Sequence, residues 1–193
     1  MTITEQKAAQ RKAGIAARRA LSDNERTHSN AALCARIMAL DCFKKAENIL
    51  LYAAFGGEAD LSALAVEAAR QGKTLAYPVC GEGFSLTAAV PGPDGWEVGT
   101  YGIRTPILSR SEILRPDQLD LVLVPCTAFD TACRRVGMGK GYYDRFLTKF
   151  TGVTAGLAYD ACFCRDALPY EKRYDKAVDF IVTEKGIYKS VRS

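Results

Sequence analysis

The chain has 193 residues, of which 48% are hydrophobic and 25% charged, and its net charge is +4. This composition is that of an ordinary soluble globular protein, and the length suits one domain with a sizeable core. The charge is too modest and too dispersed to indicate nucleic acid as a partner. No run approaches the roughly 20 apolar residues needed to span a bilayer, so we expect no membrane association.

The first predicted elements are two helices. Residues 4–20 are rich in alanine, and at 100° per residue Lys7, Arg11 and Arg18 project within about 40° of one another. Ser22 to Glu25 has the sequence of a capping box, which predicts the start of a second helix that continues to about Leu40.

The middle of the chain alternates between strand and helix signals. Predicted are a strand at 48–53, a turn at 55–58, a helix at 60–70, a strand at 73–77 stopped by Pro78, and an edge strand at 84–90. Residues 91–106 are dense in proline and glycine and predict a long surface loop, which carries Trp96 and Tyr101.

The last third of the chain continues this alternation. The apolar run 119–124 predicts a strand buried on both faces, and it is followed by a glycine-rich segment and a helix to about Phe150. Two further strands are predicted at 153–158 and 178–183. The pattern predicts an α/β fold, a three-layer Rossmann-like sandwich whose mostly parallel sheet has helices on both faces. We expect residues 1–193 to form a single domain.

Cysteine and histidine usage limits the chemistry. Seven cysteines, odd in number and irregularly spaced, indicate reduced thiols rather than a disulfide framework. Cys162 and Cys164 lack CxxC spacing and His28 is the only histidine, which argues against a zinc site and against most histidine acid–base schemes. The N-terminus lacks the apolar segment of a signal peptide, so we expect a cytoplasmic protein.

The glycine-rich segment 134–144 is the most informative part of the sequence. Gly137, Gly139 and Gly141 stand at every second position, which lets the backbone approach a ligand and turn N–H groups onto an oxyanion. The start of the following helix adds partial positive charge, and Arg135 and Lys140 add full charges. Ligands of such sheets bind beyond the carboxyl ends of strands, where this segment lies. We therefore predict a phosphate-binding loop.

Known phosphate loops do not match this segment. The chain contains no GxxxxGK[ST] motif, the third glycine comes one residue too early for GxGxxG, and kinase signatures are missing. The run from Pro125 to Asp144, PCTAFDTACRRVGMGKGYYD, resembles the pattern PxxxFDxxGxRLGxGxGYYD of the 5-formyltetrahydrofolate cyclo-ligase family. Other segments similar to that family follow in the same order: the pair Lys7 and Arg11, then 55–60, 102–106 and 175–183.

The resemblance implies an ATP-dependent ligase that cyclises 5-formyltetrahydrofolate to 5,10-methenyltetrahydrofolate and releases ADP and phosphate. The formyl oxygen attacks the γ-phosphate to give a phosphorylated imidate, N10 attacks the activated carbon, and phosphate leaves. Such chemistry depends on positioning and charge neutralisation more than on a protein nucleophile. ATP and Mg²⁺ are the implied cofactors, and a monomer acting on small molecules is the expected form.

The resemblance also implies roles for individual residues. The catalytic residues would be Arg135, Lys140 and Tyr142. ATP would be bound by Lys7, Arg11, Arg135, Gly137, Gly139, Lys140, Gly141 and Tyr143. The folate substrate would be bound by Ala53, Glu58, Met138 and Tyr142, and Mg²⁺ by Asp144 and Asp179.

Several of these residues have plainer alternatives. Lys7 and Arg11 could form a solvated basic helix face, and Asp144 could stabilise the first turn of its own helix. Asp179 could be a solvated residue at a strand start, and Glu58 an ordinary loop acid. Trp96 and Tyr101 could stack on a ligand or pack on the domain.

The chain also departs from the family pattern. Met138 stands where arginine is common, Leu61 near the usual threonine, and Thr105 where the family has glutamate. Cys133 replaces a glycine, so a positive φ at this position would be strained.

Two other functions stay open on the sequence alone. One is a paralogue that binds nucleotide or folate without catalysis. The other is an RNA-binding module, against which the aromatic and basic residues fail to interleave along any predicted strand.

Overall fold

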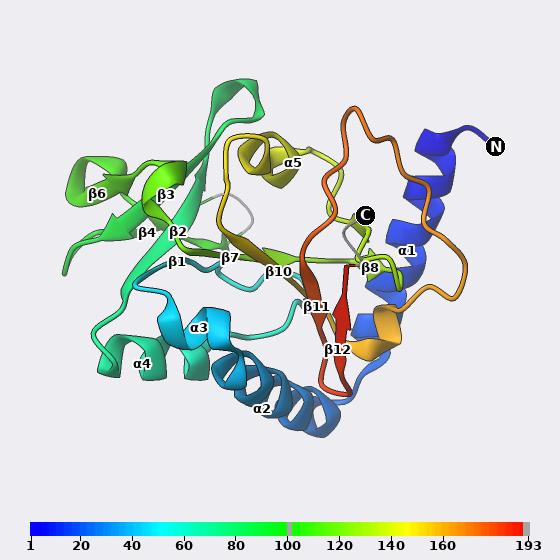
Figure 1. The fold of residues 1–193 in the computed structure, drawn as a ribbon, viewed down its shortest axis with the longest axis horizontal. Helices are drawn as coiled ribbons and strands as arrows, with labels where there is room; N and C mark the ends of the chain where they lie inside the picture. The colour runs from blue at the N-terminus through cyan, green and yellow to red at the C-terminus, as the bar shows by residue number, and fades with distance from the viewer. Residues whose placement is uncertain (100–101, 191–193) are drawn as a thin grey trace.

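A computed structural model describes residues 1–99 and 102–190. Its centre is an eight-stranded sheet in the order β12-β11-β10-β7-β1-β2-β3-β6 (Figure 1). The strands are β1 Asn48–Leu50, β2 Thr74–Cys80, β3 Leu86–Pro91, β6 Ser111–Leu114, β7 Leu121–Pro125, β10 Val153–Leu157, β11 Phe180–Val182 and β12 Ile187–Lys189. Neighbours from β2 to β11 pair in parallel, whereas β3, β6 and β12 add antiparallel margins. The predicted mostly parallel sheet is confirmed.

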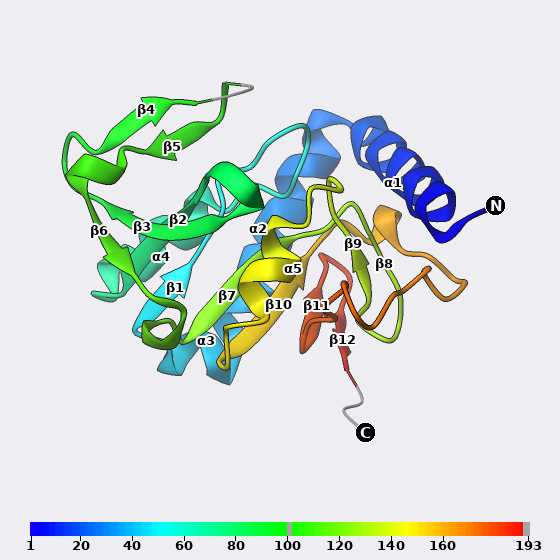
Figure 2. The same cartoon turned by 90° about the horizontal axis from the view of Figure 1, so that it is seen from above.

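Helices cover both faces of the sheet, as predicted. The helices are α1 Ile3–Ala20, α2 Asp23–Ala39, α3 Asp41–Lys45, α4 Ser62–Arg70 and α5 Tyr142–Leu147. Helices α2 to α4 lie on one face and α5 on the other, while α1 lies beside the end of the sheet (Figures 1 and 2). Among the described residues, no helix has both the length and the apolar character needed to cross a membrane.

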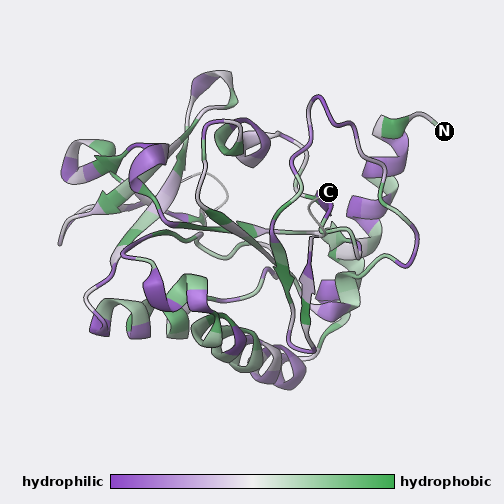
Figure 3. Cartoon of the chain, in the orientation of Figure 1, coloured by the Kyte–Doolittle hydropathy of each residue, from purple (hydrophilic) through white to green (hydrophobic). Residues whose placement is uncertain are grey.

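The alternation of side chains along β7 divides the core into two layers. Leu121 and Leu123 pack with α2 and α4, whereas Val122 and Val124 pack with Phe146 of α5 and its neighbours. All four β7 side chains are fully buried, which explains the continuous apolar run in the sequence. In Figure 3 hydrophobic positions follow the central strands, and hydrophilic positions lie on the outer surfaces of the helices.

Both N-terminal helices have the predicted extents. Each begins with a complete capping box, formed by Thr2 with Glu5 in α1 and by Ser22 with Glu25 in α2. These reciprocal bonds satisfy backbone donors that a helix start leaves unpaired.

Three predictions in the middle of the chain were wrong. Pro78 does not stop β2, because β1 ends opposite Ala76 and beyond that point β2 has a ladder only with β3, where a missing N–H is tolerated. The strand predicted at the edge, β3, lies between β2 and β6. The predicted loop 91–106 contains a hairpin of β4 (Trp96–Val98) and β5 (Arg104–Pro106), and Tyr101 lies outside the described residues.

Helix α1 packs very closely against the chain that follows β7. A side chain on Gly14 would overlap the carbonyl oxygen of Thr127, so only glycine allows this approach. The segment of contact leads into a short hairpin of β8 (Ala128–Phe129) and β9 (Arg135–Val136). The glycine-rich loop begins where this hairpin ends, so α1 lies next to it.

We expect Gly14→Ala to lower the free energy of unfolding by about 1–3 kcal/mol, because the new methyl group meets backbone that cannot move aside. An alanine in an unobstructed helix would instead stabilise by about 1 kcal/mol, so the sign itself is the test. Urea denaturation measures the change. Gly186→Ala is the matched control, since its new methyl group would meet no other described residue within 4 Å, and equal stability of both variants would contradict the prediction.

Candidate active site

The glycine-rich loop lies beyond the carboxyl end of β7 and leads into α5. Gly139 and Gly141 have φ values of 93° and 71°, a conformation that side chains disfavour. The Arg11 side chain crosses the loop, where its Nε donates to the Gly137 carbonyl oxygen at 2.8 Å. A Cβ on Gly139 would lie 2.7 Å from Nη2 of Arg11. The glycines therefore permit both the bend of the loop and the approach of α1.

Arg135 is buried and paired with Asp144. Its side chain is 3% exposed, and its Nη2 lies 2.9 Å from Oδ1 of Asp144, which is 24% exposed. The same carboxylate oxygen accepts from the backbone N–H of Lys176 at 3.1 Å. Nε of Arg135 is buried and has no partner in the part of the chain that the structure describes. The ion pair thus fixes the Arg135 guanidinium and leaves its Nε–H available as a donor.

Lys7 is held by two carboxylates from the C-terminal part of the chain. Its Nζ lies 3.1 Å from Glu171 and 2.6 Å from Asp175. Burial lowers the pKa of Lys7, but hydrogen bonds and charge from Asp175 and Glu171 outweigh that effect and raise it above its ordinary value. The alternative of a solvated basic face is therefore wrong for Lys7, and neither carboxylate could be assigned to it from sequence spacing.

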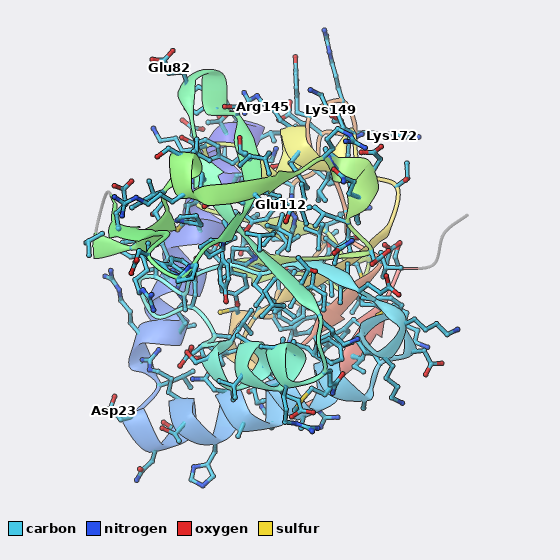
Figure 4. The ribbon with its side chains drawn as sticks, turned by 90° about the vertical axis from the view of Figure 1, so that its left-hand side faces the viewer. Asp23, Glu82, Glu112, Arg145, Lys149 and Lys172 are labelled. Carbon is cyan, nitrogen blue, oxygen red and sulfur yellow. The ribbon has the colours of Figure 1, made fainter. Side chains whose placement is uncertain are left out.

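The turn between β2 and β3 lies beside the glycine-rich loop and contacts it through Phe84. Phe84, with φ of 58°, lies 5.8 Å from the Tyr142 ring, 5.9 Å from the Lys140 ammonium and 5.1 Å from the Arg145 guanidinium. Figure 4 shows this turn, marked by Glu82, on the same side as Arg145, with Asp23 on the opposite side. Lys140 is exposed, and its charge is open to a ligand.

Glu58 lies on the half-buried turn 55–58, and its side chain is 10% exposed. Burial raises the pKa of the Glu58 carboxyl, although a hydrogen bond from the Phe55 backbone and the charge of Arg18 oppose the rise. The Tyr143 hydroxyl is buried without a hydrogen-bond partner among the described residues, and burial followed by the charge of Glu58 raises its pKa. A buried carboxylate and a buried unpaired hydroxyl suit recognition of a polar ligand.

A cavity of about 440 Å³ opens at the carboxyl end of β1. Ala53, Tyr77, Trp96 and Arg104 are among its lining residues. Trp96 packs edge-on against Tyr77 at 4.8 Å, and its ring carries the Arg104 guanidinium at 4.6 Å. The β4–β5 hairpin, which the sequence predicted to be a loop, therefore supplies aromatic and cationic side chains to the wall of the cavity.

The structure does not bring Asp179 to Asp144. Asp179 precedes β11 at the amino end of the sheet, where its carboxylate accepts from the backbone and hydroxyl of Thr154 at 2.9 and 2.8 Å. Asp175 directly precedes Lys176, whose backbone N–H donates to Asp144. Within residues 1–99 and 102–190, no group of three or more acidic, cysteine or histidine residues has the arrangement of a metal site.

Comparison with known proteins gives the family. The model of the 5-formyltetrahydrofolate cyclo-ligase family matches residues 3–184. The chain belongs to this family. The 5-formyltetrahydrofolate cyclo-ligase of Haemophilus influenzae is 32% identical over 134 residues, covering 66% of this chain and 71% of the relative. That of Escherichia coli K12 is 27% identical over 177 residues, covering 89% and 96%.

A solved structure agrees with this assignment. The 5,10-methenyltetrahydrofolate synthetase of Aquifex aeolicus superposes with a TM-score of 0.80 at 33% identity, covering 97% of this chain and 94% of that one. The predicted resemblance and fold class are thereby confirmed, and the chain is a member of a family of ligases.

The structure shows the surroundings of three departures from the cyclo-ligase pattern. Cys133 has a positive φ of 57°, as its replacement of a glycine suggested, and its buried thiol lies 3.5 Å from the Tyr188 carbonyl oxygen. Met138 is 49% exposed on the loop, so no buried charge has been left without a partner by the loss of an arginine there. Thr105 donates to the Ile103 carbonyl oxygen within the β5 turn.

We expect Asp144→Asn to destabilise the protein by about 2 kcal/mol, because it removes the charge opposite the buried Arg135 guanidinium. The estimate lies between the small effect of exposed ion pairs and the larger effect of fully buried ones. Asp117→Asn is the control, since Asp117 and its partner Arg115 are both 68% exposed. Equal denaturation midpoints for the two variants would show that the buried pair is not stabilising.

Proposed function

We propose that the protein converts 5-formyltetrahydrofolate and ATP to 5,10-methenyltetrahydrofolate, ADP and phosphate. The observation that carries the proposal is the convergence of Arg11 from α1 with Arg135 and Lys140 around one glycine-rich loop, with Lys7 one helical turn before Arg11. A triphosphate suits such a site, because four cations lie near a loop whose glycines let a ligand approach the backbone closely. Membership in the cyclo-ligase family supports the folate substrate.

In this proposal the loop and its cations act on the transferred phosphoryl group. The formyl oxygen attacks the γ-phosphorus and ADP leaves; N10 then attacks the activated carbon, its proton is lost, and phosphate departs. Lys140 is exposed and can follow charge as it develops, whereas Arg135 is fixed by Asp144. Positioned cations of this kind are a principal source of catalysis in phosphoryl transfer.

The folate would lie between the loop and the cavity at the end of β1. Glu58 would accept from N–H groups of the pteridine ring, Ala53 would contact the ring through backbone and methyl surface, and Tyr142 would lie near the formyl group. Met138, which is 49% exposed on the loop, would contact the same ligand. Tyr143 would donate its unpaired hydroxyl within the site.

The carboxylates present fit Mg²⁺, which favours oxygen ligands and commonly uses one or two carboxylates with substrate phosphates. Asp144 would hold the ion together with Asp175, whose neighbour Lys176 donates its backbone N–H to Asp144. When bound, the ion would neutralise phosphate charge. We propose a monomeric enzyme that acts on small-molecule substrates.

The decisive assay follows the absorbance of 5,10-methenyltetrahydrofolate with 5-formyltetrahydrofolate, ATP and Mg²⁺. Product formation that requires ATP supports the proposal. Binding of ATP or folate without product, from folded protein, would identify a non-catalytic paralogue and overturn it.

We expect Lys140→Ala to lower kcat by about a hundredfold, the size of losing one charge-stabilising donor in a transition state. Stability should stay unchanged, because Lys140 is exposed and its ammonium lies 5.9 Å from the Phe84 ring, a weak contact. Lys149→Ala is a matched control, an exposed lysine just beyond α5 that points outward (Figure 4). Parallel losses of kcat and stability would assign Lys140 a structural role instead.

A further inference from the structure

Arg18 is the most completely buried charged residue of the site region. It lies on α1, two turns beyond Arg11, and is 2% exposed. Arginine is rarely buried unless its charge and donors are matched by acceptors. The sequence places Arg18 on the same side of α1 as Lys7 and Arg11, yet nothing in the proposed reaction uses it.

The Arg18 side chain holds the turn that carries Glu58. Its Nε donates to the Gly56 carbonyl oxygen at 3.0 Å, and Nη1 lies 3.8 Å from Oε1 of Glu58. Gly56 and Gly57 have φ values of 57° and 81°, so the direction of their carbonyl groups depends on a conformation that glycine favours. Nη1 of Arg26 adds a 3.4 Å bond to the Gly57 carbonyl oxygen. The turn is therefore fixed from its outer side by two arginines.

Glu58 depends on Arg18 for its charge balance. Oε2 of Glu58 accepts from the Phe55 N–H at 3.1 Å, and Arg18 forms its one ion pair in the described part of the chain. The charge of Glu58 in turn raises the pKa of three neighbouring groups, Tyr52, Cys126 and Tyr143. Burial raises the pKa of each of these three, so all are neutral near pH 7 and cannot replace the guanidinium.

We propose that Arg18 is a positioning residue that keeps the Glu58 carboxylate ionised and directed at the pteridine ring of the folate substrate. The inference rests on the proposed function and adds a residue that does not itself touch the substrate. Arginine suits the task because its planar group meets a carbonyl and a carboxylate in two directions at once. Nη1, buried and without a hydrogen-bond partner among the described residues, leaves room for a shorter contact with Glu58 when ligand binds.

The test compares Arg18→Met, Arg18→Lys and Glu58→Gln with a control, Arg19→Met, which changes the exposed neighbouring arginine. Binding of 5-formyltetrahydrofolate and of ATP is measured by calorimetry, and kcat/KM is followed from pH 5 to pH 9. We expect Arg18→Met to weaken folate binding by about tenfold or more, as for loss of a charge-assisted contact, with ATP binding unchanged. Arg18→Lys should restore part of the loss.

The pH profile has a defined sign. Glu58 binds substrate as the carboxylate, so activity falls as pH drops through its pKa. Arg18 lowers that pKa, and its removal should move the acid limb of kcat/KM to higher pH. Glu58→Gln should abolish this limb.

A double variant separates positioning from general stability. In the Glu58→Gln background, Arg18→Met should change folate binding less than about threefold, because the carboxylate through which it acts is gone. The same tenfold loss in both backgrounds, or equal losses for ATP and folate, would overturn the inference. If Arg18→Met fails to fold, the inference is tested with Arg18→Lys and with the double variant. In the double variant Glu58→Gln has removed the carboxylate charge that Arg18 would otherwise balance. Wild-type protein without cyclo-ligase activity would refute the proposed function, whereas active wild type with an unaffected Arg18→Met variant would refute this inference alone.

Discussion

The close packing of α1 on the chain after β7 is the constraint on which the rest of the site depends. Gly14 allows the helix to contact the Thr127 backbone, and the helix positions one turn before and after it then reach inward. Arg11 meets the glycine-rich loop, and Arg18 meets the turn that bears Glu58. One helix thereby connects the loop assigned to nucleotide with the turn assigned to folate, and its distance from the sheet sets the distance between them.

Positive charge in the site is matched before any ligand arrives. Lys7 is paired with Glu171 and Asp175, Arg135 with Asp144, and Arg11 with a backbone oxygen. These contacts orient the cations and limit the repulsion between them. A bound triphosphate would replace these protein oxygens with its own. Each paired cation would therefore add less to the binding free energy than an unpaired cation would. Lys140 differs, since it is exposed at the entrance of the site.

The sequence was most informative where one local rule decides the structure. The capping box at Ser22 to Glu25 placed the start of α2, and the run at 119–124 indicated a strand buried on both faces. It was least informative where the answer depends on distant partners. Pro78 is tolerated because a neighbouring strand ends early, and the carboxylates around Lys7 lie 164 and 168 positions away. In the sequence, Arg18 lies on the same helix face as Lys7 and Arg11 and looks like another exposed basic residue. Only the packing of α1 in the structure shows that Arg18 is buried.

The order of synthesis gives the long-range contacts of α1 a further meaning. Arg11 bonds to a residue 126 positions later, and Lys7 to one 168 positions later. While the chain leaves the ribosome, α1 emerges first but has no partner in the glycine-rich loop until that loop follows, and the carboxylates of Lys7 appear later still. The proposed site can therefore be complete only after residue 175 has been synthesised, because Asp175 is one of the partners of Lys7.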